Sequence, residues 1–189
     1  AGEGQSSMEE LRYDSVGPTV GRDLQTRAVT SIILSLIAIV IYIAWAFHKV
    51  SQPVSSWKYG VCAILALVHD VIIIIGFFAV MGHYFGYQLD ITSIAVILTV
   101  LGYSVNDTIV VFDRTRENLF RLRQSFAETV NISLNQTLAR SLYTSFTTML
   151  ALVAIVIFGG SSIRNFALAL TVGVFFGTYS SIFVASPLL

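Results

Sequence analysis

Cysteine and charge are both scarce in this sequence. Cys62 is the single cysteine among 189 residues, which excludes an intrachain disulfide and a metal site built from thiolates. Only 12% of the residues are charged, and 11 Lys and Arg balance 11 Asp and Glu, so the formal net charge is zero. Because no basic tract with interleaved aromatic residues is present either, the sequence does not indicate a nucleic acid partner. We expect no metal and no cofactor.

Long apolar runs dominate the chain instead. Hydrophobic residues make up 55% of it, and the mean hydropathy is +0.77. These residues gather in runs long enough to cross a bilayer as helices, which is typical of an integral membrane protein. The sequence therefore predicts an all-α bundle with five spans, at 28–47, 59–81, 91–112, 138–158 and 165–189.

Two segments lie outside these spans. Residues 1–26 are polar and rich in glycine, and we expect an extracytoplasmic tail that ends a domain whose body is absent. Residues 113–137 carry four arginines and an apolar stripe, which predicts one amphipathic helix on the cytoplasmic membrane surface, or two short ones. The stripe consists of Leu119, Leu122, Phe126 and Val130, and Ser125 with Glu128 resembles a capping box that restarts the helix.

The start of the sequence bears on its extent. It does not begin with Met, and no basic segment precedes a short apolar stretch and a small-residue cleavage site. We expect a fragment or a processed chain without a signal peptide.

Lys and Arg in the short loops predict the orientation. The connections after the first and third spans hold two and four, whereas those after the second and fourth hold none and one. Because cytoplasmic loops are enriched in Lys and Arg, the first pair is expected in the cytoplasm. Residue 1 then lies on the periplasmic side and residue 189 on the cytoplasmic side, and a chain that starts in the cytoplasm needs one more span before residue 1.

Asp107 lies inside the otherwise apolar span 91–112. Helix rise places it roughly 7 Å inside the nearer end of the span. A charge at that depth is costly, and ionisable residues in membrane helices commonly line a bundle interior or a water-filled path for ions or protons. A neutral acid that locks the helix through a hydrogen bond is the alternative. His69 and Asp70 lie near the centre of span 59–81 and raise the same question.

Further polar residues lie on or beside the same face of two consecutive spans: Thr99, Tyr103, Asn106, Arg140 and Thr144. Because these spans run in opposite directions, Asp107 and Arg140 fall at similar depths in the cytoplasmic half and could meet. Two facing polar stripes would accompany a water wire. The alternatives are hydroxyls that bond to their own helix and an arginine that reaches for the cytoplasmic interface.

Small residues recur every four positions in the last span, at Ala169, Gly173, Gly177, Ser181 and Ala185. Such a face lets helix backbones approach closely. We assign it to helix packing and to no chemistry.

At these motifs the chain resembles the SecF family, the smaller membrane subunits of the bacterial SecD/SecF protein-export complex, in the resistance-nodulation-division superfamily. The resemblance rests chiefly on residues 102–114, GYSVNDTIVVFDR. Shorter motifs agree in the same order: VGPTVG at 16–21, His-Asp at 69–70, TLARS at 137–141, FGG at 158–160 and GTYSSIF at 177–183.

The resemblance implies a six-span subunit of which the first span and most of a periplasmic domain are absent here. It implies pairing with SecD, or fusion to a SecD half, and work beside the SecYEG channel with SecA, with YajC and YidC as further partners. Such a subunit is no enzyme. It couples proton flow to preprotein export, and the family's proton-handling pair falls on Asp107 and Arg140. Asp107 would change protonation as helix motion changes its distance to Arg140.

Two other classes of function are compatible with an acidic residue inside a membrane helix. A proton-coupled exporter of small solutes also belongs to the superfamily. An intramembrane aspartyl protease would place two carboxylates, here Asp70 and Asp107, on neighbouring spans. One such class carries a glycine directly before its aspartate, whereas Asn106 precedes Asp107.

Overall fold

The computed structural model describes residues 18–47, 55–122 and 124–189, and these residues form a bundle of long helices. The helices are α1 (Pro18–Ala46), α2 (Ser56–Phe85), α3 (Ile91–Arg121), α4 (Phe126–Phe158) and α5 (Ser161–Ser180), followed by a π-helical turn η1 (Ser181–Ala185) and the short α6 (Ser186–Leu188). Within this described part, five helices are long and apolar enough to cross a membrane. The prediction of an all-α membrane bundle is confirmed.

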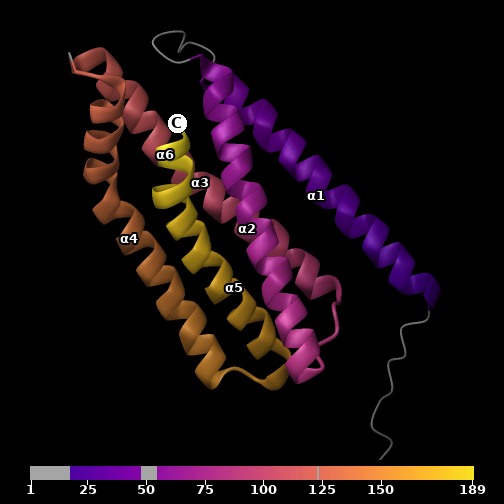
Figure 1. The fold of residues 1–189 in the computed structure, drawn as a ribbon. Coiled ribbons are helices and arrows are strands. Elements are labelled where there is room, and N and C mark those ends of the chain that lie inside the picture. Colours follow the sequence, from indigo (N-terminus) through magenta and orange to yellow (C-terminus); the bar gives the residue numbers. More distant parts are fainter. Residues whose placement is uncertain (1–17, 48–54, 123) are drawn as a thin grey trace, which may run out of the picture.

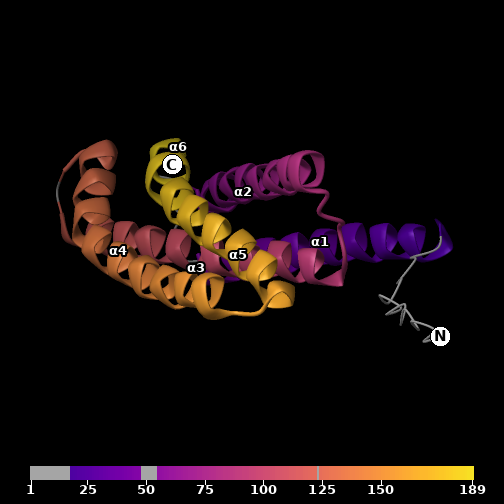
Figure 2. The ribbon, with the colours of Figure 1, turned by 90° about the horizontal axis from the view of Figure 1, so that it is seen from below.

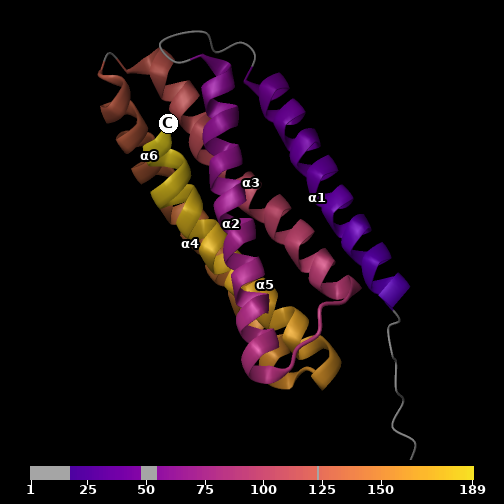
Figure 3. The same cartoon turned by 45° about the vertical axis from the view of Figure 1, so that its right-hand side comes forward.

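Helices α3 and α5 occupy the centre of the bundle (Figure 1). On one edge α1 packs against α2 and α3, and on the other α4 packs against α3 and α5 (Figure 3). Seen from below, α4, α3 and α1 lie in a row with α2 to one side of it (Figure 2). Neighbouring helices can therefore bury polar side chains on α3 and α5.

A tight connection joins α2 to α3. Gly86 ends α2 at φ 66°, a left-handed conformation that favours glycine, and its N–H donates to the Gly82 carbonyl at 3.1 Å. Asp90 then caps α3, accepting a hydrogen bond from the Ser93 N–H at 2.9 Å. The two helices consequently run in opposite directions.

The expected separate surface helix at 113–137 does not form. Its first part continues α3 to Arg121, and α4 begins at Phe126, where Ser125 is the N-cap and accepts from the Glu128 N–H at 3.3 Å. Ion pairs one turn apart support the extension of α3, with Glu117 bonded to Arg114 at 2.5 Å and to Arg121 at 2.8 Å. The residues of the predicted apolar stripe therefore belong to the ends of two long helices, with Leu122 as the C-cap of α3.

The expected tail is also partly helical, because α1 begins at Pro18. Proline suits the first turn of a helix, where its missing N–H needs no partner. An i,i+4 contact between Arg27 and Asp23 at 3.6 Å lies in the same stretch. Residues 1–17, the rest of the predicted tail, lie outside the described residues.

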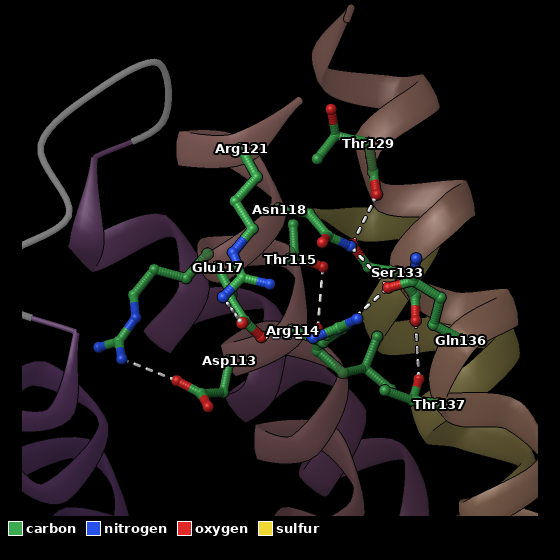
Figure 4. Close-up of polar contacts among 12 residues, drawn as sticks. Asp113, Arg114, Thr115, Glu117, Asn118, Arg121, Thr129, Ser133, Gln136 and Thr137 are labelled. Carbon is green, nitrogen blue, oxygen red and sulfur yellow. Dashed lines mark hydrogen bonds and ion pairs between the residues drawn. The ribbon is translucent and has the colours of Figure 1, made fainter. Parts of the chain in front are cut away.

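Polar side chains join the end of α3 to the start of α4 (Figure 4). The Arg114 Nε donates to the Gln136 amide oxygen at 2.6 Å, and the buried Asn118 amide donates to the Ser133 hydroxyl at 2.8 Å. These bonds cross between the two helices, so they hold α4 at a defined rotation against α3.

Arg116 and an aromatic cluster join the end of α1 to α2 and α3. The Phe47 ring stacks on Tyr59 with centroids 5.3 Å apart, and Phe112 meets Tyr59 edge to face at 5.4 Å. The Arg116 guanidinium lies 5.7 Å from the Phe47 centroid and donates to the Ala46 carbonyl at 3.2 Å. The end of α1 is therefore fixed, although most of its apolar side chains are exposed and would contact lipid.

Candidate functional site

Asp107 is buried at the centre of the bundle, with 8% of its surface exposed. Its Oδ1 accepts a hydrogen bond from the Ser141 hydroxyl of α4 at 2.5 Å, and its Oδ2 accepts one from the Ser181 hydroxyl of η1 at 2.8 Å. A carboxylate on α3 therefore binds two other elements at once, and its hydrogen bonds satisfy a group that would be costly to bury alone.

Asp70 of α2 forms a second buried carboxylate site, with 1% of its surface exposed. Its Oδ2 accepts hydrogen bonds from the Ser104 hydroxyl and, at 2.7 Å, from the Ser180 hydroxyl. Its Oδ1 lies 3.0 Å from the Nδ1 of His69, whose side chain is 34% exposed. Asp70 thus joins α2 to α3 and α5 as Asp107 joins α3 to α4 and η1.

The two carboxylates meet consecutive serines, Ser180 and Ser181, where α5 passes into the π-helical turn η1. Single π-turns inside α-helices are uncommon and recur at functional sites. The Ser186 hydroxyl donates to the Ser181 carbonyl at 2.7 Å, which satisfies an oxygen of this irregular turn.

Small residues let α5 come close enough for these bonds. Gly173 lies against Val100 and Ile74, and a Cβ at Gly177 would be 3.1 Å from the Cβ of Ser104. Ala169 and Ser181, on the same face, are buried. The four-residue spacing of small side chains therefore faces α2 and α3, where Ser104 and both carboxylates lie.

Arg140 does not contact Asp107 in this structure. It is exposed, and its guanidinium makes no hydrogen bond or ion pair within the described part of the chain. The next residue, Ser141, holds Asp107 instead. A helix turns by about 100° per residue, so the two side chains of Arg140 and Ser141 point in different directions.

The polar face of α4 therefore differs from the one that the sequence suggested. The buried face consists of hydroxyl residues spaced by four: Thr129, Ser133, Thr137, Ser141 and Ser145. That spacing can be read from the sequence. The prediction instead placed the polar face on the side of the helix that carries Arg140.

The remaining expected polar residues separate into two groups. Tyr103 is half-buried and donates to the Ser145 hydroxyl at 3.1 Å, and Ser145 lies 2.5 Å from the Thr178 hydroxyl, so these three join α3, α4 and α5. Three others are exposed: Thr99, Asn106 and Thr144. The Thr144 hydroxyl donates to the Arg140 carbonyl at 2.9 Å, which is the bond to its own helix that the sequence left open.

The hydrogen bonds of the two aspartates depend on their protonation state. Among the described residues, no group of three or more His, Cys, Asp or Glu side chains could hold a metal ion. An ionised carboxylate only accepts hydrogen bonds, whereas a protonated one also donates. Protonation of either aspartate would therefore rearrange hydrogen bonds that cross between helices.

Comparison with known proteins gives a consistent result. A family model described as "Protein export membrane protein SecD/SecF, C-terminal" matches residues 2–189. The chain is 52% identical to the protein translocase subunit SecF of Thermobaculum terrenum over 184 residues, which cover 97% of this chain and 57% of the relative. It is 46% identical over 179 residues to the protein translocase subunit SecDF of Thermus thermophilus, covering 94% and 23%.

A solved structure has the same fold over most of this chain. "Crystal structure of SecDF in Super-membrane-facing form" superposes with a TM-score of 0.74 at 44% identity, covering 92% of this chain and 22% of that one. The chain thus spans a little over half of the SecF relatives and about a quarter of the SecDF relatives that it matches. None of these names favours a solute exporter or an intramembrane protease.

Proposed function

The chain belongs to the SecD/SecF protein export family, and from this premise we propose that it is the transmembrane part of a SecF-like subunit. Such a subunit uses the proton motive force to promote preprotein translocation across the cytoplasmic membrane after SecA-driven transport. The family and the five apolar helices make the chain part of a multi-pass protein of the bacterial inner membrane.

The observation that carries the proposal is the pair of serine bonds to Asp107. The Ser181 hydroxyl lies 2.8 Å from Asp107 Oδ2 and 2.9 Å from the Thr178 carbonyl, and one hydroxyl proton serves one acceptor at a time. An ionised carboxylate is the stronger acceptor, so Ser181 donates to Asp107 until that group takes up a proton. Ser181 then turns to the Thr178 carbonyl, and the bond from α3 to η1 weakens.

The energy of one proton crossing the membrane is comparable with that of one such hydrogen bond. A proton that crosses the membrane supplies about 2.3 kcal/mol per 100 mV. A hydrogen bond to a charged group contributes about 1.5 to 3 kcal/mol. The potential therefore matches one such bond, whereas shifting a two-state equilibrium from 1:99 to 99:1 needs about 5.5 kcal/mol. The pH gradient or several protons must add to the potential.

Arg140 enters the proposal through a second conformation. It directly precedes Ser141, so a rotation of α4 by about 100° would bring Arg140 to the place that Ser141 occupies beside Asp107. Arginine can offer two parallel donors to a carboxylate. The exchange of Ser141 for Arg140 would stabilise ionised Asp107 in one state of the transport cycle.

The partners and the orientation are also part of the proposal. The SecDF names of two relatives support SecD, or a fused SecD half, as the partner. SecYEG with SecA, the preprotein, and YajC and YidC follow from the family. The loop charges support the orientation with the residue 1 side periplasmic and the residue 189 side cytoplasmic.

The test is Asp107→Asn in the full-length subunit, reconstituted with SecD, SecYEG and SecA in vesicles. Asparagine keeps the size and removes titration, so we expect assembly to persist and stimulation of translocation by a proton gradient to be lost. Arg140→Ala should also be inactive. Asp113→Asn on the exposed end of the same helix is the matched control and should retain stimulation. Equal stimulation in wild type and Asp107→Asn would refute the proposal.

A further inference from the structure

Asp70 is a buried carboxylate that the proposed mechanism does not use. It is less exposed than Asp107, at 1% against 8%, and it contacts Ser104, Ser180 and His69. A carboxyl group is costly to bury in an apolar bundle, and these partners, which come from α2, α3 and α5, satisfy its oxygens.

Two connections tie Asp70 to Asp107. Ser180 bonds to Asp70 and the next residue, Ser181, bonds to Asp107, so one turn of α5 and η1 meets both carboxylates. On α3, Ser104 bonds to Asp70 and lies one turn before Asp107. The close approach of Gly177 to Ser104 keeps these elements together.

Ser180 has the same choice of acceptors as Ser181. Its hydroxyl lies 2.7 Å from Asp70 Oδ2 and 3.1 Å from the Gly177 carbonyl. Each serine therefore responds to the protonation of its own carboxylate, and because the serines are consecutive, a displacement of one moves the other.

We propose that Asp70 and Asp107 form one coupled protonation pair, joined by the Ser180–Ser181 turn and by α3, in which Asp70 is a positioning residue for Asp107. Two negative charges repel each other strongly in a low-dielectric interior, so ionisation of one carboxylate disfavours ionisation of the other. Asp107 then takes up and releases the proton, and the charge of Asp70 influences how readily it does so. This inference adds a residue to the proposed function, but its test does not depend on transport.

The other titratable groups around Asp70 are few. His69 lies on the same helix at 3.0 Å, and the Tyr179 ring of α5 lies 6.5 Å from the His69 ring. On α3 the residue that contacts Asp70 is Ser104, and Asp107 lies three residues further along that helix. No charged side chain of α1 or η1 contacts Asp70 within the described residues. His69→Gln therefore serves to separate the histidine's contribution from that of Asp107.

The test follows the carboxyl infrared band of Asp107 as a function of pH in the full-length subunit with SecD in lipid. The band is assigned by its loss in Asp107→Asn. In Asp70→Asn, removal of the neighbouring charge should move the midpoint of the Asp107 band to lower pH by about one unit. Ser180→Ala, which touches Asp70 and not Asp107, should move it in the same direction by less, whereas His69→Gln should change it less than Asp70→Asn.

The matched control is Ser133→Ala, a buried serine near the start of α4 that bonds to Asn118 and to the Thr129 carbonyl. It should leave the midpoint unchanged. An unchanged Asp107 midpoint in both Asp70→Asn and Ser180→Ala, or an Asp107 band that does not titrate, would overturn the coupling. The export role of Asp107 is measured separately by translocation. A titrating Asp107 band with an unchanged midpoint would overturn the coupling alone, whereas a band that does not titrate would also contradict the proposed function.

Discussion

At the scale of single residues, Asp107 depends on hydroxyl groups that belong to other helices. Each of its oxygens accepts one serine hydrogen bond, from Ser141 and from Ser181. Serine is small enough to fit between packed helices, and its hydroxyl can turn toward a second acceptor without moving the backbone. The site therefore combines a buried carboxyl group with hydroxyl donors that can turn to a different acceptor.

The Ser141 bond predicts a specific loss of function. Ser141→Ala removes the donor to Asp107 Oδ1 while the helix keeps its backbone bonds. A hydrogen bond to a charged group contributes about 1.5 kcal/mol or more, so we expect proton-stimulated translocation to fall about tenfold. Thr144→Ala, at an exposed position one turn from Arg140, is the matched control. Equal rates for the two variants in reconstituted vesicles would contradict the role of Ser141.

Asp90 provides a second prediction at residue scale, outside the spans. Partial burial raises the pKa of Asp90, but hydrogen bonds from the Thr92 hydroxyl and from the N–H and hydroxyl of Ser93 together hold that pKa below its usual value. Because the folded pKa lies below the unfolded value of about 3.9, the capping contribution is complete above that pH and is lost as pH falls through the folded pKa.

Asp90→Ala should therefore lower the free energy of unfolding by about 1 kcal/mol at neutral pH. The difference from wild type should shrink as pH falls below the unfolded value of about 3.9 and through the lower folded pKa, where the wild-type carboxylate also takes up protons. Thermal unfolding in detergent at neutral pH and at acidic pH measures it. A difference that stays constant with pH would show that the cap does not depend on the charge of Asp90.

At the scale of elements, the small residues on one face of α5 determine where the serine hydroxyls of the site lie. Gly173 and Gly177 bring the backbone of α5 against α2 and α3, and only at that separation do Ser180 and Ser181 reach the two carboxylates. The close packing of this face therefore allows the hydrogen bonds between the two serines and the two carboxylates.

Gly173→Ala tests this packing. The new methyl would overlap Val100, a β-branched side chain with little freedom in a helix, so we expect destabilisation by about 1 to 3 kcal/mol. Gly76→Ala is the matched control, because a Cβ there meets nothing within 4 Å, and it should be neutral or slightly stabilising. Thermal unfolding compares the stability of the two variants. Equal stability would show that the small-residue face of α5 does not pack closely against α2 and α3.

At the scale of the whole molecule, the charges of the loops predict the orientation of the protein in the membrane. The loop asymmetry of six Lys and Arg against one predicts that the ends of α1 and α3 lie in the cytoplasm. The two carboxylates then lie in helices whose opposite ends face different compartments, as a proton pathway requires.

Single cysteines test this orientation in a full-length chain in which Cys62 is replaced by alanine. A cysteine at Arg121 should be protected from a membrane-impermeant thiol reagent in intact cells, whereas one at Gln88 should react. Both positions are exposed, so burial in the protein does not explain protection. The reverse pattern would invert the orientation.

The amino-acid sequence by itself determined that five long helices form, whereas α1 begins before its predicted span, α3 ends after it and α4 begins before it. Apolar runs long enough to cross a bilayer must be helical, because no other open structure satisfies their backbone groups in lipid. Asp107 could be selected for the same kind of reason, since a carboxylate within such a run is costly in any arrangement of helices. The position of Ser125 before a new helical stretch likewise identified the start of α4.

Only the tertiary structure decided which side chains meet. Residue spacing groups side chains on one face of a helix but does not give the rotation of that face against its neighbours, so Arg140 was expected beside Asp107 where Ser141 lies. The same limit concealed the contact of Asp70 with Ser180, residues far apart in the chain. Those contacts arise because small residues let α5 pack between α2, α3 and α4, and that packing depends on all four helices together.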